Sequence, residues 1–346
     1  MAIDYTHTRE TTQLSDRVKR LREKSTGTTP YISTERAELI TEFYSSKEVG
    51  SFSTPVLRAR AFKYILEKKE VYIGKGELIV GERGPAPRAT PTYPELCCHS
   101  LEDLDVLSSR ERTRFDVDER AMEVYRDKII PFWAGRSIRD RVFTSMTSEW
   151  KRAFDVGVFT EFMEQRAPGH AIMDDKIYKI GISGLIERAR KVRESLDFYN
   201  DPLAYDKEQE LLAMEIAGEA IILFAKRHSH KARELAEKEN DAKRKEELLR
   251  IADICERIPE NPPRNFWEAL QMYWFVHLGV ITELNVWDSF NPGRLDLNLY
   301  PFYKADLETG KLTKEFATEL LQCFWIKFNN QPAPPKVGVT DEQSAT

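Results

Sequence analysis

His170 is the first residue whose type and surroundings suggest chemistry. It directly follows Pro168 and Gly169 in the segment FMEQRAPGH, residues 162–170. Proline and glycine interrupt the helical pattern, so the imidazole must lie on irregular backbone, where catalytic and binding residues concentrate. An imidazole takes up and releases protons near neutral pH. The simpler alternative, which this segment alone favours, is a histidine that only braces the turn by hydrogen bonds.

Asp288 belongs to a second polar group, which follows a strongly apolar segment. Glu283 and Asn285 precede it, and Trp287 and Phe290 flank it. A carboxylate among aromatic side chains is unfavourable unless it is paired. Asp288 therefore has either an arginine or backbone partner with a purely structural role, or a pKa that its surroundings adjust for acid and base chemistry. The residues alone leave both interpretations open.

A third polar group lies further along the chain. Arg294 and Asp296 are spaced for an internal ion pair that fixes a loop, and we favour this structural interpretation. The last 18 residues add Gln331, Lys336 and Ser344, on backbone that several prolines keep out of helix.

Common catalytic and metal-binding motifs are missing from the sequence. It has no HExxH, GxSxG or Walker motif, and Gly74 and Gly76 lack the third glycine of a dinucleotide fingerprint, which favours a simple turn. His228 and His230 are two residues apart, so on a helix they point to different sides and make a poor metal pair. The four cysteines form no CxxC pair, which favours free thiols over a disulfide scaffold or a zinc site.

Periodicity predicts the elements that position these groups. Apolar residues recur at helical spacing in several segments, which we predict as helices: 34–46, 55–69, 118–133, 148–164, 266–279 and 313–328. Residues 206–257 predict a long two-helix hairpin that breaks near 239–241. Residues 71–82 have the short β-branched and apolar runs of a small β-hairpin. Residues 84–94 contain four prolines and should be irregular or extended.

The helix predicted at 266–279 matters most for the polar groups. Asn265 and Glu268 have the spacing of a capping box. The helix is apolar on nearly all faces, so it must be buried, and it should place the following residues, including Asp288, deep in the protein.

Composition sets limits on the partners. The chain has 346 residues, of which 41% are hydrophobic and 32% charged, and this balance is typical of a folded protein. Its net charge of −5 gives no argument for nucleic acid or for an anionic membrane surface. The longest apolar stretch, 272–281, is shorter than a membrane span, and the first 20 residues lack an export signal. We expect a cytoplasmic protein that binds a small molecule.

Several motifs in order resemble the glycyl radical enzyme family, the pyruvate formate-lyase-like group. They cover most of the chain: ELIVGERG at 77–84, PTYPELCCHS at 91–100, FMEQRAPGH at 162–170, FWEALQMYWF at 266–275, PGRLD with LYPFY at 292–303, and KFNNQPAPPKVG at 327–338. Within that family, TELNVWDSFNPGRLD is similar to the hydroxyproline dehydratases.

The resemblance implies an α/β fold, mainly helical, that forms the N-terminal portion of a ten-stranded β/α barrel. Residues 1–346 would be an incomplete pyruvate formate-lyase-like domain, because the family's catalytic cysteine and radical glycine would follow Thr346. The resemblance implies no cofactor bound by this chain. The complete enzyme would carry a glycyl radical, installed by a radical SAM activating enzyme. A homodimer, or association with a C-terminal half, is expected, and the chain alone should be inactive.

The chemistry implied by the resemblance is radical removal of water from trans-4-hydroxy-L-proline. Hydroxide is a poor leaving group, so a proton donor is needed near it, and His170 and Asp288 are the acid and base candidates. Phe162 would stack on the substrate ring and exclude water, and Ser344 would hydrogen-bond the substrate. No metal ligand is expected.

Two alternatives remain open. The same scaffold can serve another substrate, such as a diol, a sulfonate or an arylacetate. The chain can also be a non-catalytic remnant that binds a partner.

Overall fold

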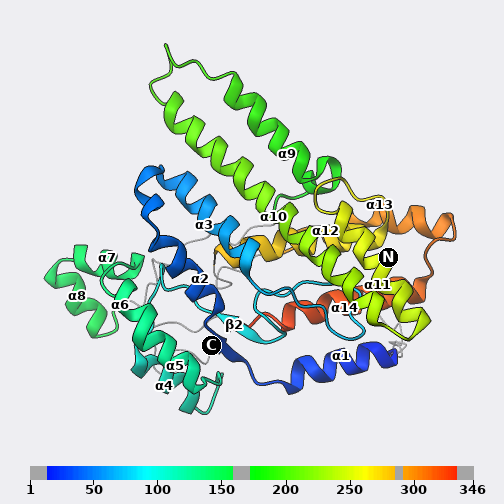
Figure 1. Cartoon of the computed structure of the whole chain (residues 1–346), viewed down its shortest axis with the longest axis horizontal. Helices are drawn as coiled ribbons and strands as arrows, with labels where there is room; N and C mark the ends of the chain where they lie inside the picture. Colours follow the sequence, from blue (N-terminus) through cyan, green and yellow to red (C-terminus); the bar gives the residue numbers. More distant parts are fainter. Residues whose placement is uncertain (1–13, 159–171, 285–290, 333–346) are drawn as a thin grey trace, which may run out of the picture.

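The computed structural model describes residues 14–158, 172–284 and 291–332, and most of these residues are helical (Figure 1). The helices are α1 (Asp16–Gly27), α2 (Glu35–Tyr44), η1 (Lys47–Ser51), α3 (Thr54–Lys68), α4 (Leu101–Ser109), α5 (Glu119–Val124), η2 (Tyr125–Ile129), α6 (Ile130–Trp133), α7 (Ile138–Ser145), α8 (Ser148–Asp155), α9 (Lys176–Glu194), α10 (Ala204–Lys238), α11 (Ala242–Arg257), α12 (Phe266–Glu283), α13 (Leu295–Glu308) and α14 (Lys314–Asn329). The strands are β1 (Tyr31–Ser33) and β2 (Ala89–Pro91). The prediction of a mainly helical chain is confirmed. Within the described ranges, no helix is long and apolar enough to cross a membrane.

Helix α10 organises one side of the molecule. Its 35 residues extend about 52 Å at 1.5 Å per residue. Helices α3, α9 and α11 all pack along it, and α9 with the N-terminal part of α10 forms the arm that projects at the top of Figure 1. The predicted hairpin over 206–257 is confirmed as α10 and α11. It breaks where expected, and the Asp241 side chain caps α11 by accepting the Arg244 N–H.

Helix α12 lies in the centre of the core, as the sequence predicts. The Asn265 side chain accepts the Glu268 N–H and so begins the helix. The Glu268 carboxylate accepts the N–H of Arg264 rather than that of Asn265, so only half of the expected capping box forms. Nearly all α12 side chains are buried, including the polar Gln271 and His277. The helix therefore runs through the interior for nearly its whole length, up to the buried Thr282.

The predicted hairpin over residues 71–82 is wrong. These residues contain no strand; Leu78, Ile79 and Val80 lie fully buried against α12. Their backbone groups pair with side chains of that helix instead of with a second strand. Val80 donates its N–H to Gln271 Oε1 and accepts from Gln271 Nε2, both at 2.9 Å. Apolar runs of this length cannot reveal from local pattern alone which partner satisfies their backbone.

Two indole N–H groups of α12 complete this arrangement. Trp267 donates to the Leu78 carbonyl and Trp274 donates to the Gly81 carbonyl, each at 2.9 Å. Gly81 has φ of 109°, and a Cβ at this position would lie 2.6 Å from the Leu278 side chain. The segment therefore approaches α12 more closely than a residue with a side chain would permit.

Replacing Gln271 by Leu should lower the free energy of unfolding by about 2–4 kcal/mol, because two buried backbone groups of Val80 lose their partners. Urea denaturation of the chain measures this loss. Gln322→Leu is the matched control: Gln322 lies on α14, forms no hydrogen bond within the described part of the chain, and its replacement should change stability by less than about 0.5 kcal/mol. Equal stability of the two variants would contradict the role of Gln271.

Residues 84–94 are mostly irregular, as predicted, but they include one strand. Strand β2 pairs in parallel with β1, with Tyr31 opposite Ala89 and Ser33 opposite Pro91. At Gly84 a Cβ would lie 2.7 Å from the Ala89 carbonyl oxygen, so the chain folds tightly on itself just before the strand.

Other predicted helices need smaller corrections. Of the helix predicted over 148–164, α8 forms and ends at Asp155, before Gly157 adopts φ of 75°, and residues 159–164 lie outside the described residues. The helix predicted over 118–133 forms as α5, η2 and α6, where η2 is a π-helical turn. The helices at 34–46, 55–69 and 313–328 are confirmed as α2, α3 and α14. Helices α1, α4, α7, α9 and α13 were not predicted.

Candidate active site

The C-terminal end of α12 is held by polar side chains from distant parts of the chain. The last carbonyls of a helix have no partner within it. Arg36 Nε donates to the Thr282 carbonyl at 2.7 Å, and the Tyr93 hydroxyl donates to the Ile281 carbonyl. A guanidinium is also electrostatically favourable at this end of a helix. The end of α12 is therefore fixed before the chain reaches residue 285.

All three guanidinium nitrogens of Arg36 donate hydrogen bonds. Its guanidinium pairs with both carboxylate oxygens of Glu95, donates to the Thr92 carbonyl, and lies 3.9 Å from the centre of the Tyr93 ring. Burial lowers the pKa of Arg36, but Glu95 outweighs this effect, so that the pKa is raised overall and the cation is permanent.

Two of the segments that contain predicted site residues are 159–171 and 285–290. Residues that flank both segments lie near this helix end. Met173, two residues after the segment 159–171, and Leu284, just before 285–290, line the same cavity of about 670 Å³. Glu283 lies in this cavity, 2.7 Å from Arg58, and burial raises its pKa although Arg58 opposes the shift. The cavity therefore places an acid with a raised pKa beside both flanks.

A third flank reaches the same region. Pro332, just before residues 333–346, accepts a 2.6 Å hydrogen bond from Arg83 Nη2. Arg83 is close enough to Tyr93 and Arg36 for both to affect its pKa.

The predicted residues themselves lie outside the described residues. Phe162 and His170 belong to 159–171, Asp288 belongs to 285–290, and Ser344 belongs to 333–346. Their predicted roles therefore stay predictions. The described residues show that the three segments leave from or return to the region around the end of α12.

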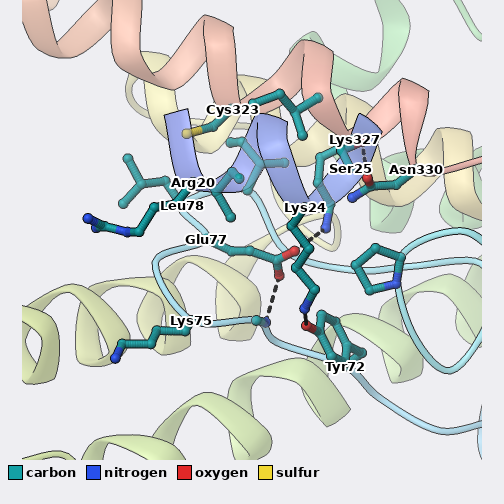
Figure 2. A pocket seen from close by; sticks show the side chains of 15 residues that line it. Arg20, Lys24, Ser25, Tyr72, Lys75, Glu77, Leu78, Cys323, Lys327 and Asn330 are labelled. Carbon is teal, nitrogen blue, oxygen red and sulfur yellow. Dashed lines mark hydrogen bonds and ion pairs between the residues drawn. The ribbon is translucent and has the colours of Figure 1, made fainter. Parts of the chain in front are cut away.

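A buried ionic cluster lies next to Pro332 in the chain, and Figure 2 shows two of its members, Glu77 and Lys327. Lys327 of α14 pairs with Glu77 at 3.0 Å and with Glu82 at 2.6 Å, and all three are nearly inaccessible to solvent. Asn330 and Gln331 donate to the carboxylate of Glu82. The cluster thus joins the end of α14 to residues 77–83.

The ionisation of this cluster follows from burial and proximity. Burial would lower the pKa of Lys327, but the two carboxylates outweigh burial and raise it. Burial raises the pKa of Glu82, and Lys327 opposes this shift. Because each charged atom already has partners, the cluster is suited to holding the chain in place rather than to moving protons.

A cavity of about 500 Å³ lies between α1, residues 72–79 and α14. Figure 2 shows the side chains that line it. Glu77 and Lys327 lie on its inner wall, and Lys24 donates to the Tyr72 hydroxyl at its edge. Cys323 also lines it.

None of the four cysteines is in a disulfide, as predicted, and Cys98, Cys255 and Cys323 are poor nucleophiles. Burial raises the pKa of Cys323 and of Cys98 to about 12, and it also raises the pKa of Cys255. A thiol with a raised pKa remains protonated at neutral pH. No group of three or more His, Cys, Asp or Glu side chains within the described ranges is arranged to hold a metal ion.

Two buried histidines of the core are neutral. Burial lowers the pKa of His228 to about 3, and burial together with the Arg83 charge lowers the pKa of His277 to about 3. Nδ1 of His228 lies 2.8 Å from the Phe224 carbonyl, and Nδ1 of His277 lies 3.2 Å from the Tyr273 hydroxyl. These side chains pack in the core and are not proton donors at pH 7.

We expect His228 to make folding sensitive to acid. In the unfolded state His228 has a pKa near 6.5 and is protonated below this pH, whereas in the folded state it stays neutral down to about pH 3. The contribution of neutral His228 to the free energy of unfolding is therefore fully present above pH 6.5 and decreases as the pH falls toward 3. Between pH 7.5 and 5.5, the wild type should lose about 1 kcal/mol more stability than His228→Phe. Urea unfolding at both pH values measures this difference.

His230→Gln is the control for this comparison, because His230 is exposed, two residues away on the same helix. Its pH dependence should match that of the wild type. If His228→Phe also matched the wild type, the account of His228 would be wrong.

The third polar group from the sequence is confirmed as an ion pair. Arg294 binds both carboxylate oxygens of Asp296, at 3.0 and 2.9 Å, and both side chains are largely exposed. Arg36, Arg83 and Lys327 are not among the residues that the sequence motifs predict. The last two stand in apolar or glycine-rich runs, IVGERG and CFWIKF, and a charge in such a run is a usable signal of a buried ion.

Comparisons with known proteins agree with this geometry. The profile of the pyruvate formate lyase-like family matches residues 10–346. The trans-4-hydroxy-L-proline dehydratase of Clostridioides difficile is 51% identical over 331 residues, which cover 96% of this chain and 42% of that protein. An isethionate sulfite-lyase of Oleidesulfovibrio alaskensis is 33% identical over 321 residues, 90% of this chain and 38% of that protein.

A solved structure gives the same result. The crystal structure of hydroxyproline dehydratase from Clostridioides difficile, with trans-4-hydroxy-L-proline bound, matches with a TM-score of 0.91 and 51% identity, over 94% of this chain and 41% of that one. The chain spans about two-fifths of the length of these relatives.

Proposed function

Because the chain belongs to the pyruvate formate lyase-like family, we propose that it forms part of a glycyl radical dehydratase that removes water from trans-4-hydroxy-L-proline. The observation that carries this proposal is the 51% identity to a dehydratase of that substrate, against 33% to an isethionate lyase. The TM-score of 0.91 to the substrate-bound dehydratase supports it. Residues 1–346 would be an incomplete catalytic domain.

The residues of this chain would handle the substrate rather than generate the radical. The glycyl radical and a catalytic cysteine, both outside this chain, would supply hydrogen-atom abstraction from the carbon beside the ring nitrogen. We propose that a radical SAM activating enzyme installs the glycyl radical. The chain alone would be inactive, and it would work as a homodimer or in association with a C-terminal half.

We assign proton transfer to His170 and Asp288. The hydroxyl group must receive a proton to leave as water, and a histidine and an aspartate that share a closed pocket can exchange that proton. Phe162 would stack on the ring and keep water away, and Ser344 would hydrogen-bond the substrate. The support is the position of the three flanks around the end of α12, at Met173, Leu284 and Pro332.

A hybrid protein tests the proposal. In it, residues 10–346 of this chain replace the region that they match in the Clostridioides difficile dehydratase. After anaerobic activation, electron paramagnetic resonance should detect a glycyl radical, and mass spectrometry should detect a product that is lighter than trans-4-hydroxy-L-proline by one water. Isethionate and 1,2-propanediol should remain unchanged. A normal radical signal without loss of hydroxyproline would refute the proposal.

A further inference from the structure

Arg83 is a buried cation without a carboxylate partner. It is 1% exposed, its Nη2 donates to the Pro332 carbonyl, and the Tyr93 hydroxyl is its other side-chain hydrogen-bond partner within the described residues. Nε and Nη1 are buried and have no acceptor there. These two atoms carry three of the five N–H donors of a guanidinium.

Two other buried cations of this region are compensated by carboxylates, whereas Lys69 donates only to backbone carbonyls within the described residues and, like Arg83, has no carboxylate partner there. Arg36 binds Glu95, and Lys327 binds Glu77 and Glu82. A backbone carbonyl accepts a hydrogen bond but does not neutralise a charge. A buried charge is strongly unfavourable without a counter-ion, so the surroundings of Arg83 are suited to binding an anion.

The planar guanidinium selects the kind of anion. It presents its N–H groups as a fork that matches the two oxygens of a carboxylate. Arg83 also lies near α12 and the third flank. It donates a hydrogen bond to the Pro332 carbonyl, and its charge lowers the pKa of His277 on α12. The amino-acid substrate of the proposed reaction has a carboxylate, and none of its assigned contacts, Phe162, His170, Asp288 and Ser344, carries a permanent positive charge.

We propose that Arg83 binds the carboxylate of the amino-acid substrate and so selects amino acids over uncharged alcohols. This inference rests on the proposed function for the identity of the substrate. Arg83 would be a specificity-determining residue, which sets the ring position relative to the proton-transferring residues without taking part in the loss of water.

Equilibrium binding to the unactivated hybrid protein tests the inference without any radical chemistry. Isothermal titration calorimetry compares trans-4-hydroxy-L-proline with its primary amide, trans-4-hydroxy-L-prolinamide, which lacks the negative charge. The wild-type hybrid should bind the acid about 30-fold or more tightly than the amide, as expected for a buried charge pair. In Arg83→Gln this preference should fall to less than about threefold, because binding of the acid weakens while binding of the amide does not.

Two further variants separate charge from structure. Arg83→Lys keeps the charge but loses the fork, so its preference should be intermediate. Arg88→Gln is the matched control: within the described residues the Arg88 side chain donates only to the carbonyls of Thr28 and Asn329, and the variant should keep the full preference for the acid.

Each outcome has one meaning. If Arg83→Gln binds acid and amide with the wild-type ratio, or if the wild-type hybrid does not distinguish them, the inference is overturned. If the ratio collapses as expected but the activated wild type never dehydrates hydroxyproline, the proposed function fails while the assignment of Arg83 stands.

Discussion

Replacing Lys327 by Met should lower the free energy of unfolding of the chain by about 3–5 kcal/mol, the range expected when one partner of a buried ion pair is removed. Met has a similar length and leaves no large cavity, so the loss reports the charge. Glu77 and Glu82 would remain buried without a cation. Urea denaturation, followed by circular dichroism, measures the effect.

A second substitution should reverse part of this loss. Adding Glu82→Gln to Lys327→Met removes one of the stranded charges, so the double variant should be more stable than Lys327→Met alone. Lys314→Met is the control on the same helix, because Lys314 is exposed and its replacement should change stability by less than about 0.5 kcal/mol. A loss below about 1 kcal/mol for Lys327→Met would contradict the account of the cluster.

Replacing Asp288 by Asn in the hybrid protein should abolish turnover of hydroxyproline. We expect a decrease of about 10²–10⁴-fold, the range for a general acid or base, and a similar decrease for His170→Ala. Both changes act on proton transfer and leave the radical machinery alone. The glycyl radical signal in electron paramagnetic resonance should therefore keep its wild-type intensity while product formation, followed by mass spectrometry, disappears.

The matched control for this prediction is Asp296→Asn. Asp296 is an exposed carboxylate eight residues further along, paired with Arg294, and its replacement should leave turnover unchanged. Undiminished turnover in Asp288→Asn would remove Asp288 from the mechanism. Loss of the radical signal together with turnover would instead indicate a structural role.

The sequence predicts best those elements whose signals are local. Asn265 and Asp241 begin α12 and α11 where the sequence suggests, because a helix cap depends on residues only three positions apart. The apolar pattern of α12 correctly predicts its burial, since a helix without a polar face has no surface to expose to solvent.

The sequence does not predict contacts between residues that are far apart along the chain. The hairpin predicted over 71–82 does not form because Gln271, about 190 residues away, satisfies the backbone of Val80. Lys327 pairs with Glu77, which is 250 residues away along the chain, and no local spacing predicts such a pair. The residues predicted from the family resemblance, among them His170 and Asp288, remain predictions, although the flanks of their segments meet near one helix end.

A crystal structure of the hybrid protein with trans-4-hydroxy-L-proline bound tests the central claim most directly. The account predicts that the substrate lies beside the C-terminal end of α12, with His170 and Asp288 both within hydrogen-bond reach of it, about 2.6–3.2 Å between heavy atoms. A structure in which the substrate lies elsewhere, or in which either side chain faces bulk solvent away from it, would contradict the account.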